Sequence, residues 1–370
     1  MYNDEYQMPI PGEFIQEELD ARGWTQRDLA YILDMNEPAL NKLIKGKHGI
    51  SPNMAKALAK AFDVDEDFFA NLQNAYDHAH AREPDPAIEC RARLQNVYPV
   101  REMIRRGWLQ DVDTALMNAQ LARFFRRSDD NILEFKHAAK KTNSGDEATP
   151  TQLAWLYRVR QIAESLQCGA YSPATLLDGL HRLRAFMAEP EEIRHVPRLL
   201  EECGVRLVFV EGLPSGKIDG VCLWLDKKSP VIGMSLRFDR IDNFWFVLRH
   251  ECEHVLREHG RNHEIIDVNL EQSDSITSVE EKLANEAAAE FCVPQEKVSS
   301  FIVRKSPLFS ERDVVAFAKL MGVHPGIVVG QIQKRTGRWD LLKRLQVKMR
   351  HLITRTAMVD GWGHVAPVQI

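Results

Sequence analysis

The sequence predicts a multi-domain protein with an all-α domain at the N-terminus, a helical middle, and an α+β domain in which a small sheet accompanies two metal-binding helices. Three observations predict this arrangement. Short capped helices follow one another over residues 11–62, β-rich runs lie between residues 205 and 236, and the motif H-E-x-x-H occupies residues 250–254. A chain of 370 residues has room for two or three such cores.

The first 62 residues carry the start and stop signals of four helices. Gly23 ends the first, Thr25 with an acid three residues later begins the second, and Asn36 is the expected N-cap of the third. A tight turn joins the second helix to the third, which is the helix-turn-helix pattern. The predicted helices cover residues 11–24, 25–35, 37–45 and 52–62.

The stretch over residues 11–76 resembles the antitoxin-type regulators called HigA, which are relatives of the phage-repressor helix-turn-helix family. The closing run from Asp67 to Tyr76 looks like the end of that domain, which we place over residues 8–80. The resemblance implies that the domain binds a DNA operator, with Gln26 at a phosphate. It also implies which residues face the major groove: Asn36, Pro38, Ala39, Asn41 and Lys42.

The charge of this N-terminal domain favours DNA binding only locally. Acidic residues outnumber basic ones over residues 1–80, whereas nucleic-acid-binding domains are usually basic. Residues 42–60, however, carry five lysines and no acid. A local basic face is therefore expected, with an affinity that falls as salt rises. The alternative is a helix-turn-helix used for dimerisation or for holding a partner protein.

The middle, residues 84–195, is expected to be a helical connecting region. Apolar and basic positions at helical spacing predict helices over residues 99–108, 112–127 and 150–167. Residues 140–150 are rich in polar and turn-forming side chains and predict a flexible loop or linker. We expect this region to orient the flanking domains or to receive a regulatory signal.

Three β-rich runs follow, over residues 205–210, 220–225 and 230–236. Turn signals rich in Gly, Pro and Ser separate them. They predict a small sheet. The run over residues 230–236 is our candidate for an exposed edge strand, which could hold an extended peptide by strand addition.

The motif His250-Glu251-Cys252-Glu253-His254 lies in a segment that reads as a helix. Positions four apart share one face of a helix, so His250 and His254 can offer their imidazoles to one metal ion. Glu251 lies about 100° round the helix, where its carboxylate can reach a metal-bound water. This is the arrangement of a zinc hydrolase. The alternative is a chance match on a helix that holds no metal.

The residues alone leave the third ligand open. The extended pattern H-E-x-x-H-x-x-G-x-x-H is excluded, because Arg257 and Gly260 stand where it needs glycine and histidine. His259 and His263 are expected at the end of the helix or beyond it. A second helix over residues 279–293, stopped by a proline, offers further candidates: Glu280, Glu281, Glu286 and Glu290.

Together, the H-E-x-x-H motif and the run from Glu281 to Pro294 resemble the two signature helices of the ImmA/IrrE family of metallopeptidases. The resemblance places the third zinc ligand at Glu281 and makes Asn285 a partner of a ligating histidine. It implies a zincin-like α+β domain over residues 196–338. Leu283 and Ala287, like the Cys-Glu pair inside H-E-x-x-H, depart from the family pattern, but no departure removes a proposed ligand or base.

This resemblance implies a zinc-dependent endopeptidase in which Glu251 takes a proton from the attacking water and passes it to the leaving amine. The implied substrate is a repressor or an antitoxin-like protein, cut in a stress or toxin–antitoxin circuit. The competing interpretation is a DNA-binding transcriptional regulator whose metal domain senses or binds a partner without cutting.

Two further helices are predicted beyond Pro294, over residues 311–320 and 325–333. His324, just before the second, is a candidate donor to an oxyanion, with a structural turn histidine as the equal alternative. Residues 339–370 are expected to form a basic amphipathic helix and a tail.

The sequence does not predict a membrane protein, because no apolar run approaches the length of a membrane span and the first residues do not resemble a signal peptide. The six cysteines lack C-x-x-C spacing and are expected to be mostly buried thiols. We therefore expect a cytoplasmic protein that binds Zn²⁺, a DNA operator and a protein partner, with a homodimer as a further expectation.

Overall fold

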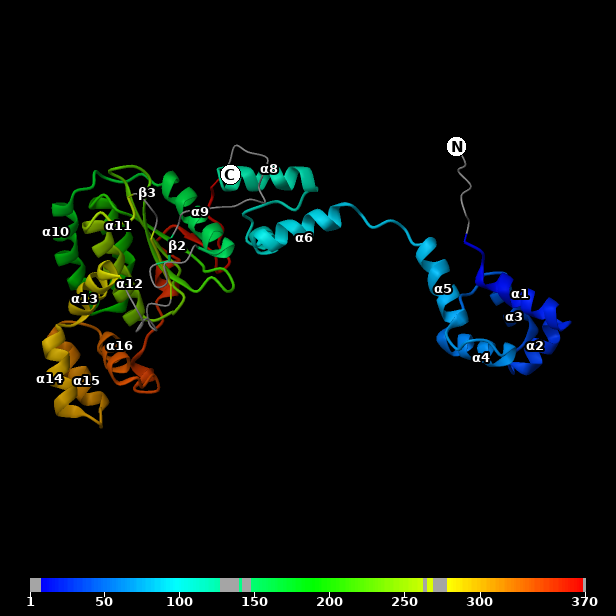
Figure 1. Cartoon of the computed structure of the whole chain (residues 1–370). Helices are drawn as coiled ribbons and strands as arrows, with labels where there is room; N and C mark the ends of the chain where they lie inside the picture. Colours follow the sequence, from blue (N-terminus) through cyan, green and yellow to red (C-terminus); the bar gives the residue numbers. More distant parts are fainter. Residues whose placement is uncertain (1–7, 127–139, 142–147, 262–264, 269–277, 369–370) are drawn as a thin grey trace. The chain divides into compact units, whose positions relative to one another are not determined.

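The computed structural model describes residues 8–126, 140–141, 148–261, 265–268 and 278–368. The chain divides into two compact units, Met1–Pro86 and Ala87–Ile370, and each has a hydrophobic core of its own (Figure 1).

The N-terminal unit is all-α, as predicted. Gly23 ends the first helix in the left-handed conformation (φ 66°), and Thr25 forms a complete capping box with Asp28. The Asn36 side chain accepts a hydrogen bond from the Ala39 amide and so caps the third helix. The helices are α1 (Pro11–Arg22), α2 (Gln26–Ile32), α3 (Glu37–Ile44), α4 (Pro52–Phe62) and α5 (Phe68–Ala79).

The second unit begins with the helices of the predicted middle. They are α6 (Ala87–Val97), α7 (Val100–Arg105), α8 (Thr114–Phe124) and α9 (Pro150–Ser165). These helices share one hydrophobic core with the sheet, because Trp155 and Val159 of α9 pack with Val208, Val221 and Val231 of the strands. The predicted divisions 84–195 and 196–338 are thus packed together in a single unit.

A mixed sheet lies at the centre of this unit, with the strand order β1-β5-β3-β4-β2-β6. β2 runs parallel to both β4 and β6, whereas β3 runs antiparallel to β4 and β5. The strands are β1 (Lys140–Lys141), β2 (Arg206–Val210), β3 (Ile218–Trp224), β4 (Pro230–Met234), β5 (Ile265–Val268) and β6 (Val359–Asp360).

The expectation that residues 230–236 form an edge strand is wrong. β4 lies between β3 and β2, and all five of its residues are buried. Its continuous apolar run is typical of a strand covered on both faces. The three predicted β runs themselves are confirmed as β2, β3 and β4.

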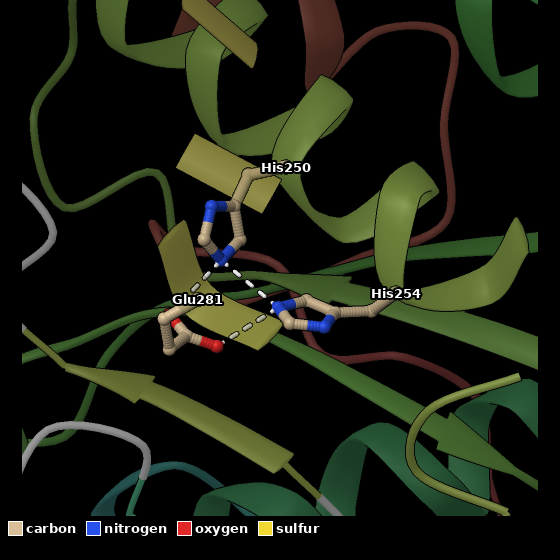
Figure 2. A group of neighbouring side chains, drawn as sticks. All are labelled: His250, His254 and Glu281. Atoms are coloured by element: carbon tan, nitrogen blue, oxygen red, sulfur yellow. Dashed lines mark hydrogen bonds and ion pairs between the residues drawn. The ribbon is translucent and has the colours of Figure 1, made fainter. Parts of the chain in front are cut away.

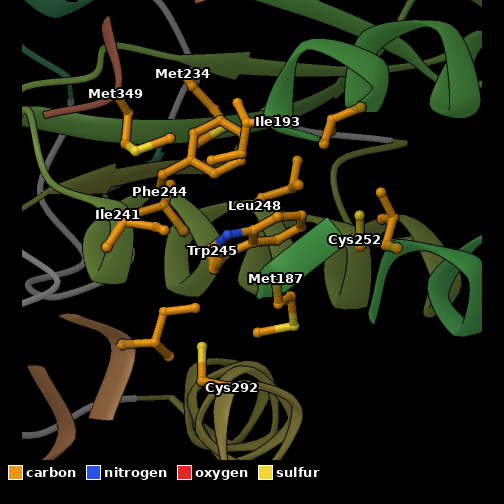
Figure 3. Packing of buried hydrophobic residues seen from close by; sticks show 14 of the residues in the cluster. Met187, Ile193, Met234, Ile241, Phe244, Trp245, Leu248, Cys252, Cys292 and Met349 are labelled. Carbon is orange, nitrogen blue, oxygen red and sulfur yellow. The ribbon is translucent and has the colours of Figure 1, made fainter. Parts of the chain in front are cut away.

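Helix α9 packs on one face of the sheet, and a second group of helices covers the opposite face. α12 (Ile241–Leu256) packs its apolar side, which includes Phe244, Trp245 and Leu248, against Met234 of β4 (Figure 3). Helix α12 contacts α10 (Pro173–Leu183), α13 (Val279–Cys292) and α16 (Pro325–Thr336). Helices α14 (Gln295–Lys305) and α15 (Glu311–Met321) pack on α16, and α11 (Val196–Glu202) packs on β2. α15 and α16 were predicted, whereas α14 was not.

The expected basic helix after residue 339 is also wrong. Only a 3₁₀ turn (Lys343–Leu345) and the short α17 (Arg350–Ile353) precede β6, which joins the sheet. Asp360 is fully buried, and its carboxylate accepts hydrogen bonds from Arg158 at 2.6 Å and from Trp108 at 2.7 Å. A buried carboxylate is costly unless it has such partners. The ion pair therefore fixes the C-terminal segment to the helical region.

The predicted loop over residues 140–150 is only partly described. Lys140–Lys141 form β1, and Thr149 caps α9, while residues 142–147 lie outside the described part of the chain. Among the described residues, no single helix is both long and apolar enough to cross a membrane. Helices α15 and α16 reach that length and apolar composition only when they are taken together, and the chain bends by 112° between them.

Candidate metal centre and helix-turn-helix surface

The metal candidates of the first motif lie on the buried side of α12. The apolar positions of this helix hold it against the sheet, and they carry His250, Glu251 and His254 into the interior, where all three side chains have no solvent exposure. Buried polar groups on a helix are costly unless they are paired or bind a metal.

The second motif lies on α13, which packs alongside α12. Ser278 caps the helix by accepting a hydrogen bond from the Glu281 amide, so that Glu281 lies in the first turn. Ala284 and Ala288 are fully buried, and their small side chains let the two helices approach closely. This packing brings the Glu281 carboxylate, also without solvent exposure, to the two histidines (Figure 2).

The three side chains form a compact cage. The Nε2 atoms of His250 and His254 are 3.0 Å apart, and the Glu281 carboxylate oxygens lie 3.4 Å and 3.1 Å from them respectively. Zinc bonds of about 2.0–2.1 Å in tetrahedral geometry place neighbouring ligand atoms about 3.3 Å apart. The donor set, two imidazole nitrogens and one carboxylate, therefore fits Zn²⁺ in both chemistry and spacing.

Glu251 does not belong to the cage but lies against the sheet beside it. A Cβ atom on Gly220 of β3 would be 2.0 Å from the Glu251 Oε1 atom. Only glycine therefore leaves room for this carboxylate at that point of the strand. No pattern in the sequence predicts this role of Gly220, because the role depends on a contact between residues far apart in the chain.

His259 lies behind the cage and is not a ligand in this arrangement. Its Nδ1 atom is 2.9 Å from Nδ1 of His254, on the side of the His254 ring that faces away from the cage. Burial lowers the pKa of His259, and the neighbouring His254 lowers it further. His263, the other downstream histidine, lies outside the described residues.

The remaining glutamates of α13 do not enter the cage. Glu280, Glu286 and Glu290 are exposed, which is the usual position of a helical glutamate. Asn285 is half-buried and lines a cavity of about 710 Å³ along α12, α13 and α16. Its buried Oδ1 atom accepts no hydrogen bond within the described part of the chain, so its expected role beside a histidine stays a prediction.

His324 caps a helix. Its Nδ1 atom accepts a hydrogen bond from the Gly326 amide at 3.0 Å, and its own amide donates to the Met187 carbonyl. Burial lowers the pKa of this imidazole. The position matches the structural alternative, and donation to an oxyanion stays a prediction.

In the N-terminal unit, the residues expected at DNA lie on α2 and α3. The Asn41 amide donates a hydrogen bond to Gln26 at 3.1 Å, which joins the two helices. Asn36 uses its side-chain oxygen in the helix cap, whereas Lys42 and Pro38 are exposed and Ala39 is half-buried.

Comparison with known proteins identifies this unit. Residues 15–69 match the family model described as helix-turn-helix. The chain is 43% identical over 70 residues to virulence-associated protein A' of Dichelobacter nodosus, and 33% identical over 73 residues to the uncharacterized HTH-type transcriptional regulator YddM of Escherichia coli K12. These matches cover 19% and 20% of this chain and 61% and 78% of the two relatives.

A third relative, an uncharacterized HTH-type transcriptional regulator of Haemophilus influenzae, is 37% identical over 67 residues, which are 18% of this chain and 63% of that protein. The chain thus spans about three fifths of the length of two of these relatives. It belongs, through its N-terminal unit, to the helix-turn-helix family.

Proposed function

We propose that this protein is a DNA-binding regulator that carries a zinc-dependent endopeptidase in its second unit and cleaves a repressor or antitoxin-like protein. The observation that carries the enzymatic part is the buried cage of His250, His254 and Glu281 with the Glu251 carboxylate beside it on the same helix. The regulatory part is supported by the helix-turn-helix family match and by the regulators that resemble it.

Each residue of the centre has a distinct task in this proposal. His250, His254 and Glu281 would hold Zn²⁺, which when bound lowers the pKa of a water and polarises a carbonyl. Glu251, held in place against Gly220, takes the proton of the attacking water and passes it to the leaving amine. The resemblance to ImmA/IrrE metallopeptidases assigns the same roles.

The helix-turn-helix would bind DNA through a lysine-rich surface that begins on α3. Lys42, Lys45 and Lys47 are exposed and have no carboxylate partner in the described part of the chain, whereas Lys56 pairs with Glu66 at 2.8 Å. When such a lysine contacts a DNA phosphate, counterions condensed on the DNA are released, and this release favours binding.

The zinc content of the purified protein tests the metal centre first. Mass spectrometry of protein prepared without chelator should give about one zinc per chain, and Glu281→Ala should lose or weaken it. Glu286→Ala is the matched control, because Glu286 is exposed on the same helix. An absence of zinc in the wild type even after reconstitution would remove the enzymatic part of the proposal.

A second candidate function is a metal-dependent sensor that does not cut, and the complete burial of the cage favours it. Cleavage of co-expressed repressor or antitoxin-like proteins distinguishes the two candidates. The endopeptidase requires that Glu251→Gln abolish cleavage while zinc remains bound. Cleavage by Glu251→Gln at the wild-type rate would refute the role of Glu251.

A further inference from the structure

A cavity of about 280 Å³ lies where three neighbouring parallel strands end. Its walls include residues 235–237 after β4, residues 211–213 after β2 and residue 362 after β6. We call it the carboxyl-edge cavity. In α/β sheets, ligands bind outside the carboxyl ends of parallel strands. None of the lining residues belongs to the His250–His254–Glu281 cage.

The carboxylates at this cavity are already engaged. Glu211 accepts a hydrogen bond from the Trp362 amide at 2.7 Å and lies 3.4 Å from the buried guanidinium of Arg106. The buried Asp219 carboxylate lies 3.8 Å from Arg237, which lines the cavity. These acids are therefore balanced by arginines.

Two cations remain. Lys217 and Arg350 both line the cavity, and neither has an ion-pair partner in the ranges that the structure describes. Arg350 is held in place, because it donates a hydrogen bond to the Leu236 carbonyl at 3.2 Å and its guanidinium lies 5.0 Å from the centre of the Trp362 ring. A guanidinium fixed in this way is preorganised to bind an anion.

The backbone around the cavity is strained. Ser215, Lys217, Leu236 and Trp362 all line it and all have positive φ, at 65°, 51°, 47° and 50°. Side-chain-bearing residues adopt this conformation at an energetic cost, and such residues gather at ligand sites. These left-handed residues lie in the three loops that bring Lys217, Arg237 and Trp362 to the cavity, while Arg350 reaches it from the start of α17.

We propose that the carboxyl-edge cavity binds the phosphate group of a small molecule. Two unpaired cations match a phosphate, which carries a charge of about −1.5 to −2 at neutral pH. Arginine and lysine supply the donors that phosphate oxygens accept. The site does not depend on peptidase activity, and binding can be measured without a protein substrate.

Fluorine NMR of the full chain labelled with 5-fluorotryptophan tests this proposal, with inorganic phosphate as the probe and sodium chloride at equal ionic strength as the reference. The chain has seven tryptophans, and the signal of Trp362 is identified as the one missing from Trp362→Phe. We expect that signal to shift saturably with phosphate. Acetate, a monoanion, should bind more weakly.

Substitutions locate the binding. Lys217→Gln and Arg350→Gln should each weaken phosphate binding roughly tenfold or more, since each removes a charge-assisted contact. Lys217 is exposed, so its substitution keeps the test valid if Arg350→Gln fails to fold. Lys228→Gln removes the same charge from an exposed turn outside the cavity and should bind like the wild type.

Three results would overturn the proposal. One is a Trp362 signal that phosphate does not move, and another is unchanged phosphate binding in Lys217→Gln. The third is tighter binding of acetate than of phosphate, which would replace the phosphate assignment by a carboxylate.

Discussion

His259 ties the metal cage to the sheet. Its side chain shares a hydrogen bond with His254, and its backbone carbonyl accepts one from the Trp224 indole at 2.8 Å. A ligating histidine whose second nitrogen is engaged has a fixed tautomer and ring orientation. His259 therefore acts through His254 as a positioning residue.

Replacing His259 by alanine should weaken zinc binding about 10- to 100-fold, the usual cost of losing such a partner. Competition with a chromogenic chelator measures the change directly and needs no substrate. His351→Ala, at an exposed position, is the control and should bind zinc like the wild type. Equal affinities of His259→Ala and the wild type would show that the contact does not support the centre.

Gly220 is the second residue on which the proposed catalysis depends. Gly220→Ala would place a methyl group 2.0 Å from Glu251 Oε1, so the carboxylate must move. We expect zinc to stay bound while cleavage falls about 100-fold or more, since correct placement of a general base contributes about 10²–10⁴-fold. Gly212→Ala meets its nearest atom at 3.7 Å and is the control. Cleavage by Gly220→Ala at the wild-type rate would contradict this role.

At the scale of single residues, the sequence predicts the roles of residues that belong to one motif. It does not predict the roles of residues that come into contact only when separate helices and strands pack together. His250, Glu251 and His254 stand within five positions, and helix geometry alone places them on adjoining faces. Gly220 and His259 acquire their roles only when β3 is paired and α12 is packed on it. Nothing in their local sequence encodes these contacts.

Among the elements, α3 is where the DNA-binding part of the proposal can be tested most sharply. Lys42 is exposed without a carboxylate partner in the described ranges, while Lys56 of α4 pairs with Glu66. A phosphate contact made by one lysine contributes about 0.9 to the dependence of log affinity on log salt concentration.

Lys42→Ala should therefore weaken operator binding and lower that salt slope by about one. Fluorescence anisotropy with DNA from the protein's own promoter, at several salt concentrations, measures both. Lys56→Ala should change the slope less, because its ammonium is already paired. An unchanged slope in Lys42→Ala would favour a helix-turn-helix used for protein contacts.

The elements also show why two sequence-based predictions failed. Residues 230–236 have the β-rich composition of a strand, but composition does not tell an edge strand from a central one until its neighbours are known. Residues 339–358 carry basic and apolar positions at helical spacing, yet the segment folds around Asp239, whose carboxylate accepts hydrogen bonds from the Met349 and Arg350 amides. Tertiary contacts therefore override the local helical preference of residues 339–358, and they set the central position of residues 230–236 without changing their strand conformation.

At the scale of the whole molecule, the chain forms two compact units, and the second contains both the predicted helical middle and the predicted α+β domain. Residues 359–366 return to the helical region, where Asp360 pairs with Arg158 and the Ala366 carbonyl accepts a further hydrogen bond from that arginine at 3.2 Å. Helices that precede the sheet in sequence and a segment that follows it thus complete one core. Such long-range closure leaves no periodic signal in the sequence.

This division predicts how the chain responds to loss of metal. All cage residues lie in Ala87–Ile370, and the first unit has its own core, built from residues such as Leu40, Leu58 and Phe62. A ligand that binds only the folded form stabilises it by about 4 kcal/mol when its concentration is a thousand times its Kd. Each kcal/mol shifts Tm by about 2–4 °C in a domain of about 150–250 residues.

Calorimetry should therefore show two transitions, and a zinc chelator should lower the Tm of only one of them, by several degrees. The unaffected transition belongs to the N-terminal unit, which is checked by its absence after deletion of residues 1–86. Glu281→Ala should melt like the chelated wild type and show no further response to chelator, because it lacks a ligand. If the chelator shifted both transitions equally, or shifted Glu281→Ala as much as the wild type, stability would depend on metal bound outside the cage.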